Sequence, residues 1–167
     1  MRRLSVGGAA LTNALEHAAP DLLAYLEHRA GPSDAPDLLG ETMVVAWRRV
    51  RDLPQDPERA RMWLFGIARG TLLNHARGAR RQWALVDRIR VLAATDEVAP
   101  PSDDGIDVRD AIARLDPDLA ELIRLVHWER FSVADAAEVL GIPASTARSR
   151  YQRAKEALRA VLRVDVV

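Results

Sequence analysis

The stretch that most constrains the fold of this chain runs from Ser132 to Leu158 and contains two helical patterns separated by one tight turn. Ser132 can accept a hydrogen bond from an N–H group at the start of a helix, and Asp135 follows three residues later, as in a capping box. Gly141 suits the left-handed position that ends a helix, and Pro143, which has no N–H, is typical of a helix start. The stretch therefore predicts a helix-turn-helix.

The second of these helices has an apolar side and a polar side. The apolar residues recur at spacings of three and four, which predicts one buried stripe: Ala147, Tyr151, Ala154, Leu158 and Leu162. The opposite side carries the candidates for DNA binding: Ser145, Arg148, Ser149, Gln152 and Arg153. Arginine can bind guanine edges, glutamine can bind adenine edges, and serine or arginine can bind phosphates. We favour DNA binding by this face; the alternative is an ordinary amphipathic hairpin with a solvated basic face.

The charges of the chain are unevenly distributed, although its formal net charge is zero. Eight arginines and one aspartate lie between Arg59 and Arg90, nine acidic residues and two arginines lie between Asp96 and Glu121, and the C-terminal helix is basic again. This alternation predicts two DNA-facing surfaces separated by a segment that avoids or mimics DNA.

Several functional classes find no support in the sequence. Thr12, Asn13 and Glu16 interrupt a weakly signal-like N-terminus, and no stretch is long enough to cross a membrane, so we expect a cytoplasmic protein without membrane insertion. Cysteine is absent, the four histidines have no metal-ligand spacing, and no phosphate loop, nucleophile elbow or HExxH motif occurs. We therefore expect no enzymatic activity, no metal, no cofactor and no small-molecule substrate.

Two helices are predicted in the first fifty residues. The first runs from about Leu11 to Ala30, and its apolar members are Leu15, Leu22, Leu23 and Leu26. The second opens at Pro36, and its spacings of four and three predict an inward side with Leu39, Met43, Trp47 and Val50. The opposite side is partly apolar and partly acidic: Asp37, Glu41, Thr42, Val45 and Arg48. Such a mixed face suits a protein partner, although a solvated face is the commoner case.

A third helix is predicted from about Ala60 to Arg81, after a loop from Asp52 to Arg59 that contains two prolines. Its expected inner side is Leu64, Ile67, Ala68, Thr71 and His75, and the simplest role for His75 is that of a core histidine. Its outer side carries Asn74, Arg77, Arg80 and Arg81. Trp63 and Phe65 near its start complete a platform for single-stranded or melting DNA. The alternative is that both rings belong to the core, which we favour for Phe65.

A linker is predicted at residues 93–107, which contain two adjacent prolines, glycine, serine and five acidic residues. Beyond it we expect a short helix to Leu115 and a helix that starts at Asp116-Pro117, with Leu119, Leu122, Ile123 and Val126 directed inward. The predicted architecture is all-α, with two small helical domains, residues 8–92 and 108–167, on a flexible acidic linker.

Several motifs together resemble a known family. Residues 37–47, Asp-Leu-Leu-Gly-Glu-Thr-Met-Val-Val-Ala-Trp, are similar to the D-L-x-Q-E-T-F-x-x-A-W signature of bacterial extracytoplasmic-function (ECF) sigma factors. Residues 63–69, Trp-Leu-Phe-Gly-Ile-Ala-Arg, resemble the family's W-L-F-x-I-A-R helix. Leu115-Asp116-Pro117, the Leu-Gly-Ile-Pro turn and residues 147–150 resemble L-P-x … L-G-V-P-x-x-T-V-K-S-R. The resemblance spans roughly residues 22–162, on both sides of the linker.

The resemblance implies a dissociable initiation subunit of RNA polymerase, with sigma region 2 in the first domain and sigma region 4 in the second. The residues that would bind the clamp helices of the β′ subunit of core RNA polymerase are Asp37, Leu38, Glu41, Thr42 and Val45. The residues that would capture the non-template strand of the −10 promoter element are Gln55, Trp63, Asn74, Arg77, Arg80 and Arg81. The residues that would read the −35 element are Ser145, Arg148, Ser149, Gln152 and Arg153, while their domain docks on the β flap.

The family also implies regulation by a separate anti-sigma factor and, when bound to polymerase, association with the nucleoid. Four residues depart from its pattern. Gly40 stands in place of glutamine, Gly70 in place of asparagine, Asn74 where aspartate is common, and Ala147 where valine is usual.

Two other classes of protein explain part of the sequence. A LuxR-like helix-turn-helix regulator that acts without core polymerase explains residues 107–167 equally well, but it does not explain the motifs at residues 37–47 and 63–69. A protein-interaction adaptor that mimics an anti-anti-sigma factor explains the acidic block, but it does not explain the outward arginines.

Overall fold

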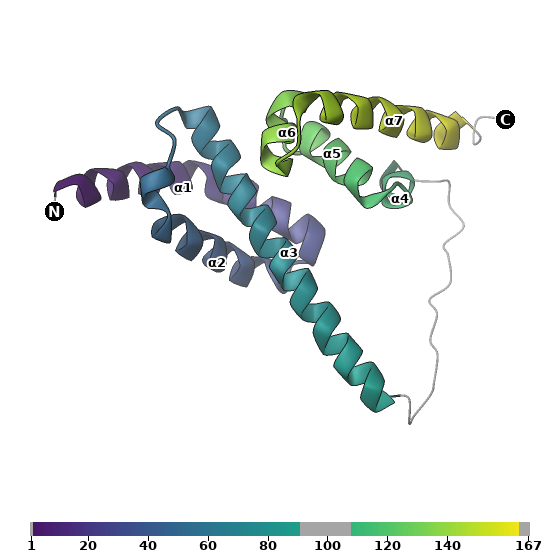
Figure 1. Ribbon diagram of the computed structural model, residues 1–167, viewed down its shortest axis with the longest axis horizontal. Coiled ribbons are helices and arrows are strands. Elements are labelled where there is room, and N and C mark those ends of the chain that lie inside the picture. The colour runs from purple at the N-terminus through teal and green to yellow at the C-terminus, as the bar shows by residue number, and fades with distance from the viewer. Residues whose placement is uncertain (1, 91–107, 164–167) are drawn as a thin grey trace. The chain divides into compact units, whose positions relative to one another are not determined.

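The computed structural model describes the backbone of residues 2–90 and 108–163 and the side chains of residues 7–81 and 108–162. All regular structure within these ranges is helical, which confirms the all-α prediction (Figure 1). The chain divides into an N-terminal and a C-terminal compact unit, and each is described by itself. The predicted linker at residues 93–107 lies outside the described residues.

The N-terminal unit consists of three α-helices that pack against one another in pairs, with a short 3-10 helix between the second and the third. Their bounds are Arg2–Ala30 (α1), Ala35–Arg48 (α2), Val50–Asp52 (η1) and Pro57–Arg90 (α3). Tyr25 of α1 and Phe65 of α3 are fully buried at the centre of the unit, with ring centroids 5.3 Å apart in an edge-to-face arrangement. The core position predicted for Phe65 is therefore confirmed. Leucines from all three helices are also buried in this unit: Leu11, Leu15, Leu22, Leu26, Leu38 and Leu64.

Helix α1 starts at Arg2, well before the predicted start, and continues through two adjacent glycines that disfavour helix. These glycines lie against the end of α2. A methyl group added at Gly7 would lie 3.5 Å from Val50 Cγ2, and one added at Gly8 would lie 3.4 Å from the Trp47 ring. We attribute the extra turns of α1 to this tertiary packing, which local sequence does not reveal.

Helix α2 turns a different side to the core from the one that periodicity predicts. The buried residues are Ala35, Leu38, Thr42 and Ala46. The residues expected at these inward positions are half-buried or, for Trp47, 46% exposed: Leu39, Met43, Trp47 and Val50. That prediction is wrong because apolar residues occur on both sides of α2, so that spacing alone does not fix its rotation. The Thr42 hydroxyl donates to the Leu38 carbonyl oxygen at 2.7 Å, which satisfies this polar group within the core.

Helix α3 packs in the core along its first half and projects beyond the other two helices along its second half (Figure 1). Four of its five predicted inner residues are buried: Leu64, Ile67, Ala68 and Thr71. The fifth, His75, is exposed, and its Nε2 lies 3.2 Å from Asp34 Oδ2 just before α2. The core role predicted for His75 is therefore wrong, because the ring lies next to Asp34 at the start of α2 and is exposed there.

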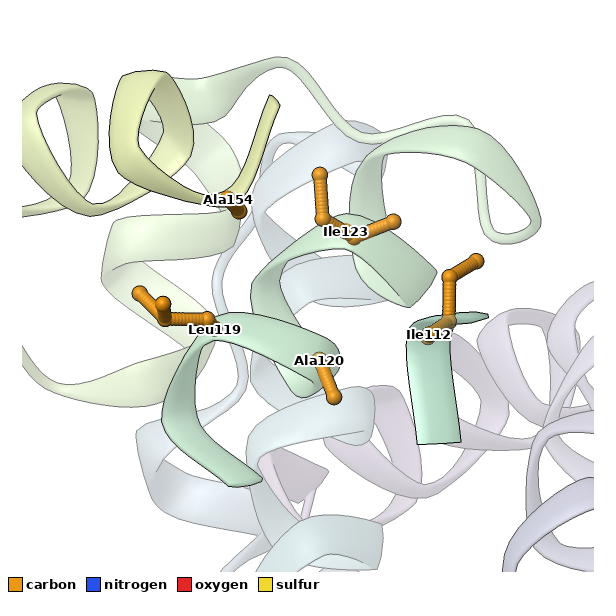
Figure 2. Close-up of a cluster of buried hydrophobic side chains, with 5 residues drawn as sticks. All are labelled: Ile112, Leu119, Ala120, Ile123 and Ala154. Carbon is orange, nitrogen blue, oxygen red and sulfur yellow. The ribbon is translucent and has the colours of Figure 1, made fainter. Parts of the chain in front are cut away.

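The C-terminal unit consists of four helices, α4 (Val108–Ala113), α5 (Pro117–His127), α6 (Val133–Leu140) and α7 (Ala144–Arg163). Figure 2 shows part of its core, in which one side chain of α4, three of α5 and one of α7 come together: Ile112, Leu119, Ala120, Ile123 and Ala154. Helix α5 begins where the sequence predicts, since Asp116 Oδ1 accepts a hydrogen bond from the Asp118 N–H at 3.0 Å. Of its predicted inward residues, Leu119, Leu122 and Ile123 are buried and Val126 is half-buried.

Candidate nucleic-acid interface

Hydrogen bonds fix the turn between α6 and α7. Ser132 Oγ accepts from the Asp135 N–H at 3.1 Å, and Asp135 Oδ2 accepts from the Ser132 N–H at 3.3 Å, so the predicted capping box is present. Gly141 has a φ of 67°, and the Ile142 N–H donates to the Ala137 carbonyl at 3.0 Å, which closes the end of α6. The helix-turn-helix prediction is confirmed.

Helix α7 has the two sides that the sequence predicts. Toward the core, Ala147 and Ala154 are buried and the rest of the stripe is half-buried. All five candidates for DNA binding are exposed: Ser145, Arg148, Ser149, Gln152 and Arg153. Ser149 Oγ donates to the Ser145 carbonyl at 3.1 Å, so its lone pairs remain to accept a hydrogen bond. This face thus presents guanidinium, amide and hydroxyl groups, which can bind base edges and phosphates of a duplex.

Two contacts on the flank of α7 hold it against α5, and a third lies within α7 itself. Arg150 Nη1 lies 2.9 Å from Asp118 Oδ2, so this arginine is directed toward α5. The adjacent Tyr151 hydroxyl lies 3.1 Å from His127 Nε2, and Lys155 Nζ lies 5.0 Å from the centre of the Tyr151 ring. The exposed side of α7 therefore has a fixed orientation within the C-terminal unit.

The second half of α3 carries the other set of candidates, and all four are exposed: Asn74, Arg77, Arg80 and Arg81. Arg77 Nη2 donates to Asn74 Oδ1 at 2.8 Å, and Arg77 Nε donates to the Leu73 carbonyl at 3.2 Å. Because the amide oxygen of Asn74 is occupied, its NH₂ group remains as a donor. This ridge therefore presents cations together with one amide donor.

The geometry of a helix places three of these residues on the same side of α3 as Trp63. Eleven residues are about three turns, so Asn74 lies roughly 16 Å along the axis from Trp63 and almost directly in line with it. Arg77 and Arg81 fall within about 40° of the same line, whereas Arg80 is rotated by about 100°. The structure thus aligns Trp63, Asn74, Arg77 and Arg81 and separates Arg80 from them.

Trp63 is half-buried near the start of α3, and Arg49, just after α2, lies over it. The guanidinium carbon of Arg49 is 5.9 Å from the centre of the Trp63 ring, and its Nε donates to Asp52 Oδ2 at 3.2 Å. Arg49 is not among the residues predicted from the sequence. Its spacing from Asp52 is visible there, but its contact with Trp63 joins the residue after α2 to α3 and leaves no local signal.

Gln55 is exposed in the connection between η1 and α3, where Asp56 Oδ2 accepts a hydrogen bond from the Arg59 N–H at 2.9 Å. A largely apolar groove of about 880 Å³ lies between this connection and α1. Gln55 lines this groove together with Asn13 and His17 of α1. Gln55 is therefore presented on a connection between helices, apart from the aligned side of α3.

The face of α2 expected to bind a protein partner is divided by the observed rotation of the helix. Asp37 and Glu41 are exposed and Val45 is half-buried. Leu38 is 2% exposed and Thr42 is fully buried, so the expectation that these two belong to an outer surface is wrong. Apolar surface on α2 is exposed instead at Val44 (49%) and Trp47 (46%).

Two further features are absent from the part of the chain that the structure describes. Within residues 2–90 and 108–163, no three potential metal ligands among histidine, aspartate and glutamate are grouped together. No helix in the same ranges is both long and apolar enough to cross a membrane.

Similarity to known proteins covers both units. Residues 14–82 match the family described as Sigma-70 region 2, and residues 106–158 match Sigma-70, region 4. The ECF RNA polymerase sigma factor SigL of Mycobacterium tuberculosis is 30% identical over 166 residues, which cover 92% of this chain and 90% of SigL. The chain belongs to the ECF sigma factors. ECF sigma factor SigC of the same organism is 32% identical over 157 residues, covering 92% of this chain and 83% of SigC.

Solved structures of sigma factors have the same fold. The sigma factor RpoE from Bartonella quintana, in a complex with the anti-sigma factor NepR, matches with a TM-score of 0.68 and 27% identity, covering 92% of this chain and 97% of that one. CnrH, in a complex with the cytosolic domain of CnrY, matches with a TM-score of 0.64 and 24% identity, covering 98% of this chain and 94% of that one. The likeness to CnrH, at 24% identity, shows a shared fold only.

These matches confirm the resemblance inferred from the sequence motifs. This ECF sigma factor has its region 2 match in the N-terminal unit and its region 4 match in the C-terminal unit. The family consists of sigma factors, which are not enzymes. The LuxR-like alternative finds no support among the matched proteins.

Proposed function

We propose that this ECF sigma factor binds core RNA polymerase, reads the −35 promoter element as a duplex and captures the non-template strand of the −10 element. The observation that supports this proposal best is that each matched unit carries an exposed cationic face on a helix that also contributes buried side chains to the core of that unit. In the C-terminal unit this face lies on α7, and in the N-terminal unit it lies on α3. The side chains of both faces are exposed and so are accessible to a partner.

The −35 element would be read by the exposed side of α7, which carries Ser145, Arg148, Ser149, Gln152 and Arg153. A major groove admits one α-helix, and its base edges are distinguished by arginine, glutamine and serine side chains. The capping box of α6 and the contacts of Arg150 and Tyr151 support this role, because they hold α7 in one orientation against the rest of its unit. The C-terminal unit would also dock on the β flap.

The −10 strand would be captured by the N-terminal unit. Trp63 offers a ring on which a base can stack, and the Asn74 NH₂ group offers a donor to a base edge. Arg77 and Arg81 lie on the same side of α3 and would bind phosphates of the strand. Arg80, which is rotated away from this side, suits an outer phosphate, and Gln55 suits a base that leaves the stack beside the η1–α3 connection.

Core polymerase would be bound through the exposed side of α2. Asp37, Glu41 and Val45 would contact the clamp helices of the β′ subunit. Leu38 and Thr42, which belong to the interior of the unit, would act by holding α2 in place. The adjacent exposed side chains of Val44 and Trp47 would extend the apolar part of this contact.

Regulation by a separate anti-sigma factor is the remaining part of the proposal. Its support is the likeness, at 27% identity, to RpoE of Bartonella quintana in its complex with the anti-sigma factor NepR. We place this activity in the cytoplasm, at the nucleoid when the chain is bound to polymerase.

A pull-down of core RNA polymerase with the purified chain, followed by run-off transcription on genomic fragments, tests the proposal. We expect stoichiometric binding to core and new transcription start sites that share a −35 and a −10 motif. Glu41→Arg should reduce binding to core because it reverses an exposed charge, whereas Glu16→Arg, an exposed charge reversal on α1, serves as the matched control. Specific duplex binding by the chain alone, without binding to core, would refute the proposal.

A further inference from the structure

Arg49 is held at two points beside the ring that the proposed function assigns to the −10 strand. Its Nε donates to Asp52 at 3.2 Å, and its guanidinium carbon lies 5.9 Å from the centre of the Trp63 ring. The Arg49 side chain nevertheless remains 53% exposed. An arginine that is both oriented and accessible loses less conformational freedom when it binds an anion than one that is unrestrained.

The guanidinium group of Arg49 retains the donors that an anion requires. A guanidinium has five N–H donors in a fixed plane, and only the Nε donor is used by Asp52. The two terminal nitrogens form a fork that matches two phosphate oxygens. The pair with Asp52 does not neutralise this site strongly, because both side chains are more than half exposed and solvent screens their attraction.

Two arginines of α3 itself, Arg61 and Arg77, make contacts with other residues than Trp63. Arg61 lies 3.2 Å from Asp21 and 4.8 Å from the centre of the Phe65 ring, which directs it toward α1. Arg77 donates to Asn74, which lies about three turns along α3 from Trp63. The contact with Trp63 therefore distinguishes Arg49 from both.

We propose that Arg49 binds the backbone phosphate next to the base that stacks on Trp63, and that Asp52 orients it for this purpose. Surfaces for single-stranded nucleic acid combine aromatic rings, on which bases stack, with cations that follow the backbone. The pairing of Trp63 with Arg49 provides both within one contact. This inference rests on the proposed function and adds to it a phosphate site formed from the end of α2, outside the basic ridge of α3.

The test measures strand binding by holoenzyme reconstituted from core polymerase and the full chain. The probe is a labelled single-stranded oligonucleotide with the non-template −10 region of a promoter mapped by run-off, together with a scrambled strand. We expect Arg49→Ala to lower the affinity for both strands about fivefold. The slope of log affinity against log salt should fall by about 0.7, as expected for one lost phosphate contact on single-stranded DNA. Arg49→Lys should keep the slope and lose less affinity, because it keeps the charge without the fork.

Arg48→Ala is the matched control, since Arg48 is the adjacent exposed arginine at the end of α2. It should leave affinity and salt slope close to those of wild type. Thermal unfolding of the Arg49→Ala chain should match wild type as well, because a merely structural role would lower its melting temperature.

Four results would overturn the inference: an unchanged salt slope in Arg49→Ala, an equal loss in Arg48→Ala, a loss confined to the cognate strand, or a lowered melting temperature. Trp63→Ala separates this inference from the proposed function. Weaker strand binding in Trp63→Ala but not in Arg49→Ala would refute the phosphate site alone. A wild-type chain that does not bind core polymerase would refute both.

Discussion

The Arg150 guanidinium lies 2.9 Å from the Asp118 carboxylate and joins α7 to α5. Arg150 sits between two exposed candidates for DNA binding, Arg148 and Arg153, yet it is only 30% exposed. Neighbouring arginines of one helix thus have different roles, because a residue two positions from Arg148 is rotated by about 200° around the helix axis.

We expect Arg150→Ala to lower the free energy of unfolding by about 0.2–1 kcal/mol, the range for an ion pair that solvent screens. Urea unfolding of this variant, of Asp118→Ala and of the double variant would isolate the pair. The affinity for duplex −35 DNA in the holoenzyme should change equally for all sequences. A changed preference at one base pair would show that Arg150 reads DNA directly.

Arg148→Ala should cost about 1–3 kcal/mol of binding at one −35 base pair, if this exposed arginine reads a base edge. The measurement is holoenzyme affinity across a set of promoters in which each −35 position is varied in turn. Glu156→Ala provides a control at an exposed residue of the same helix outside the candidate set. A uniform loss on every promoter would instead make Arg148 a phosphate contact.

Arg77→Ala should impair promoter opening more than closed-complex formation, because Arg77 both carries charge and holds the Asn74 amide at 2.8 Å. A fluorescent base analogue in the −10 region would report opening, and footprinting before opening would report closed binding. Arg80→Ala should have the smaller effect, since Arg80 is rotated away from the side shared with Trp63. Equal losses in opening and in closed binding would contradict strand capture by Arg77.

Two glycine substitutions should have opposite effects on stability. Gly141→Ala should destabilise the C-terminal unit by about 1–2 kcal/mol, because Gly141 has a φ of 67° that residues with a Cβ adopt at a cost. Gly66→Ala should stabilise the N-terminal unit by about 0.5–1 kcal/mol, because Gly66 lies within α3 and a methyl group there meets nothing within 4 Å. Chemical denaturation measures both, and a stabilised Gly141→Ala chain would contradict the turn geometry.

The parts of the fold that could be predicted from sequence are those fixed by neighbouring residues. The capping box at Ser132, the turn at Gly141 and the start of α5 at Asp116 each depend on chemistry within a few residues of the chain. The exposed side of α7 could be predicted for a related reason. Its apolar and polar positions separate cleanly around the helix, so that only one rotation buries the apolar stripe.

The parts that could not be predicted depend on contacts between distant segments. Helix α2 has apolar residues on both sides, and the structure buries Ala35 and Ala46 while Met43 is half-buried and Trp47 is exposed. The exposure of His75 depends on where α2 begins relative to α3. The contact of Arg49 with Trp63 likewise joins the residue after α2 to α3, and no local pattern indicates it.

Helix α3 continues beyond Thr71 without a single fully buried side chain up to residue 81. A helical segment without tertiary packing is only marginally stable in water, and Gly78 weakens this one further. The ridge with Asn74 and Arg77 is thus stabilised mainly by continuity with the packed half of the same helix, and its amide hydrogens should exchange with solvent progressively faster toward residue 81. Fraying of this helix would then compete with promoter opening. Part of the free energy of binding the strand would be used to order the end of the helix.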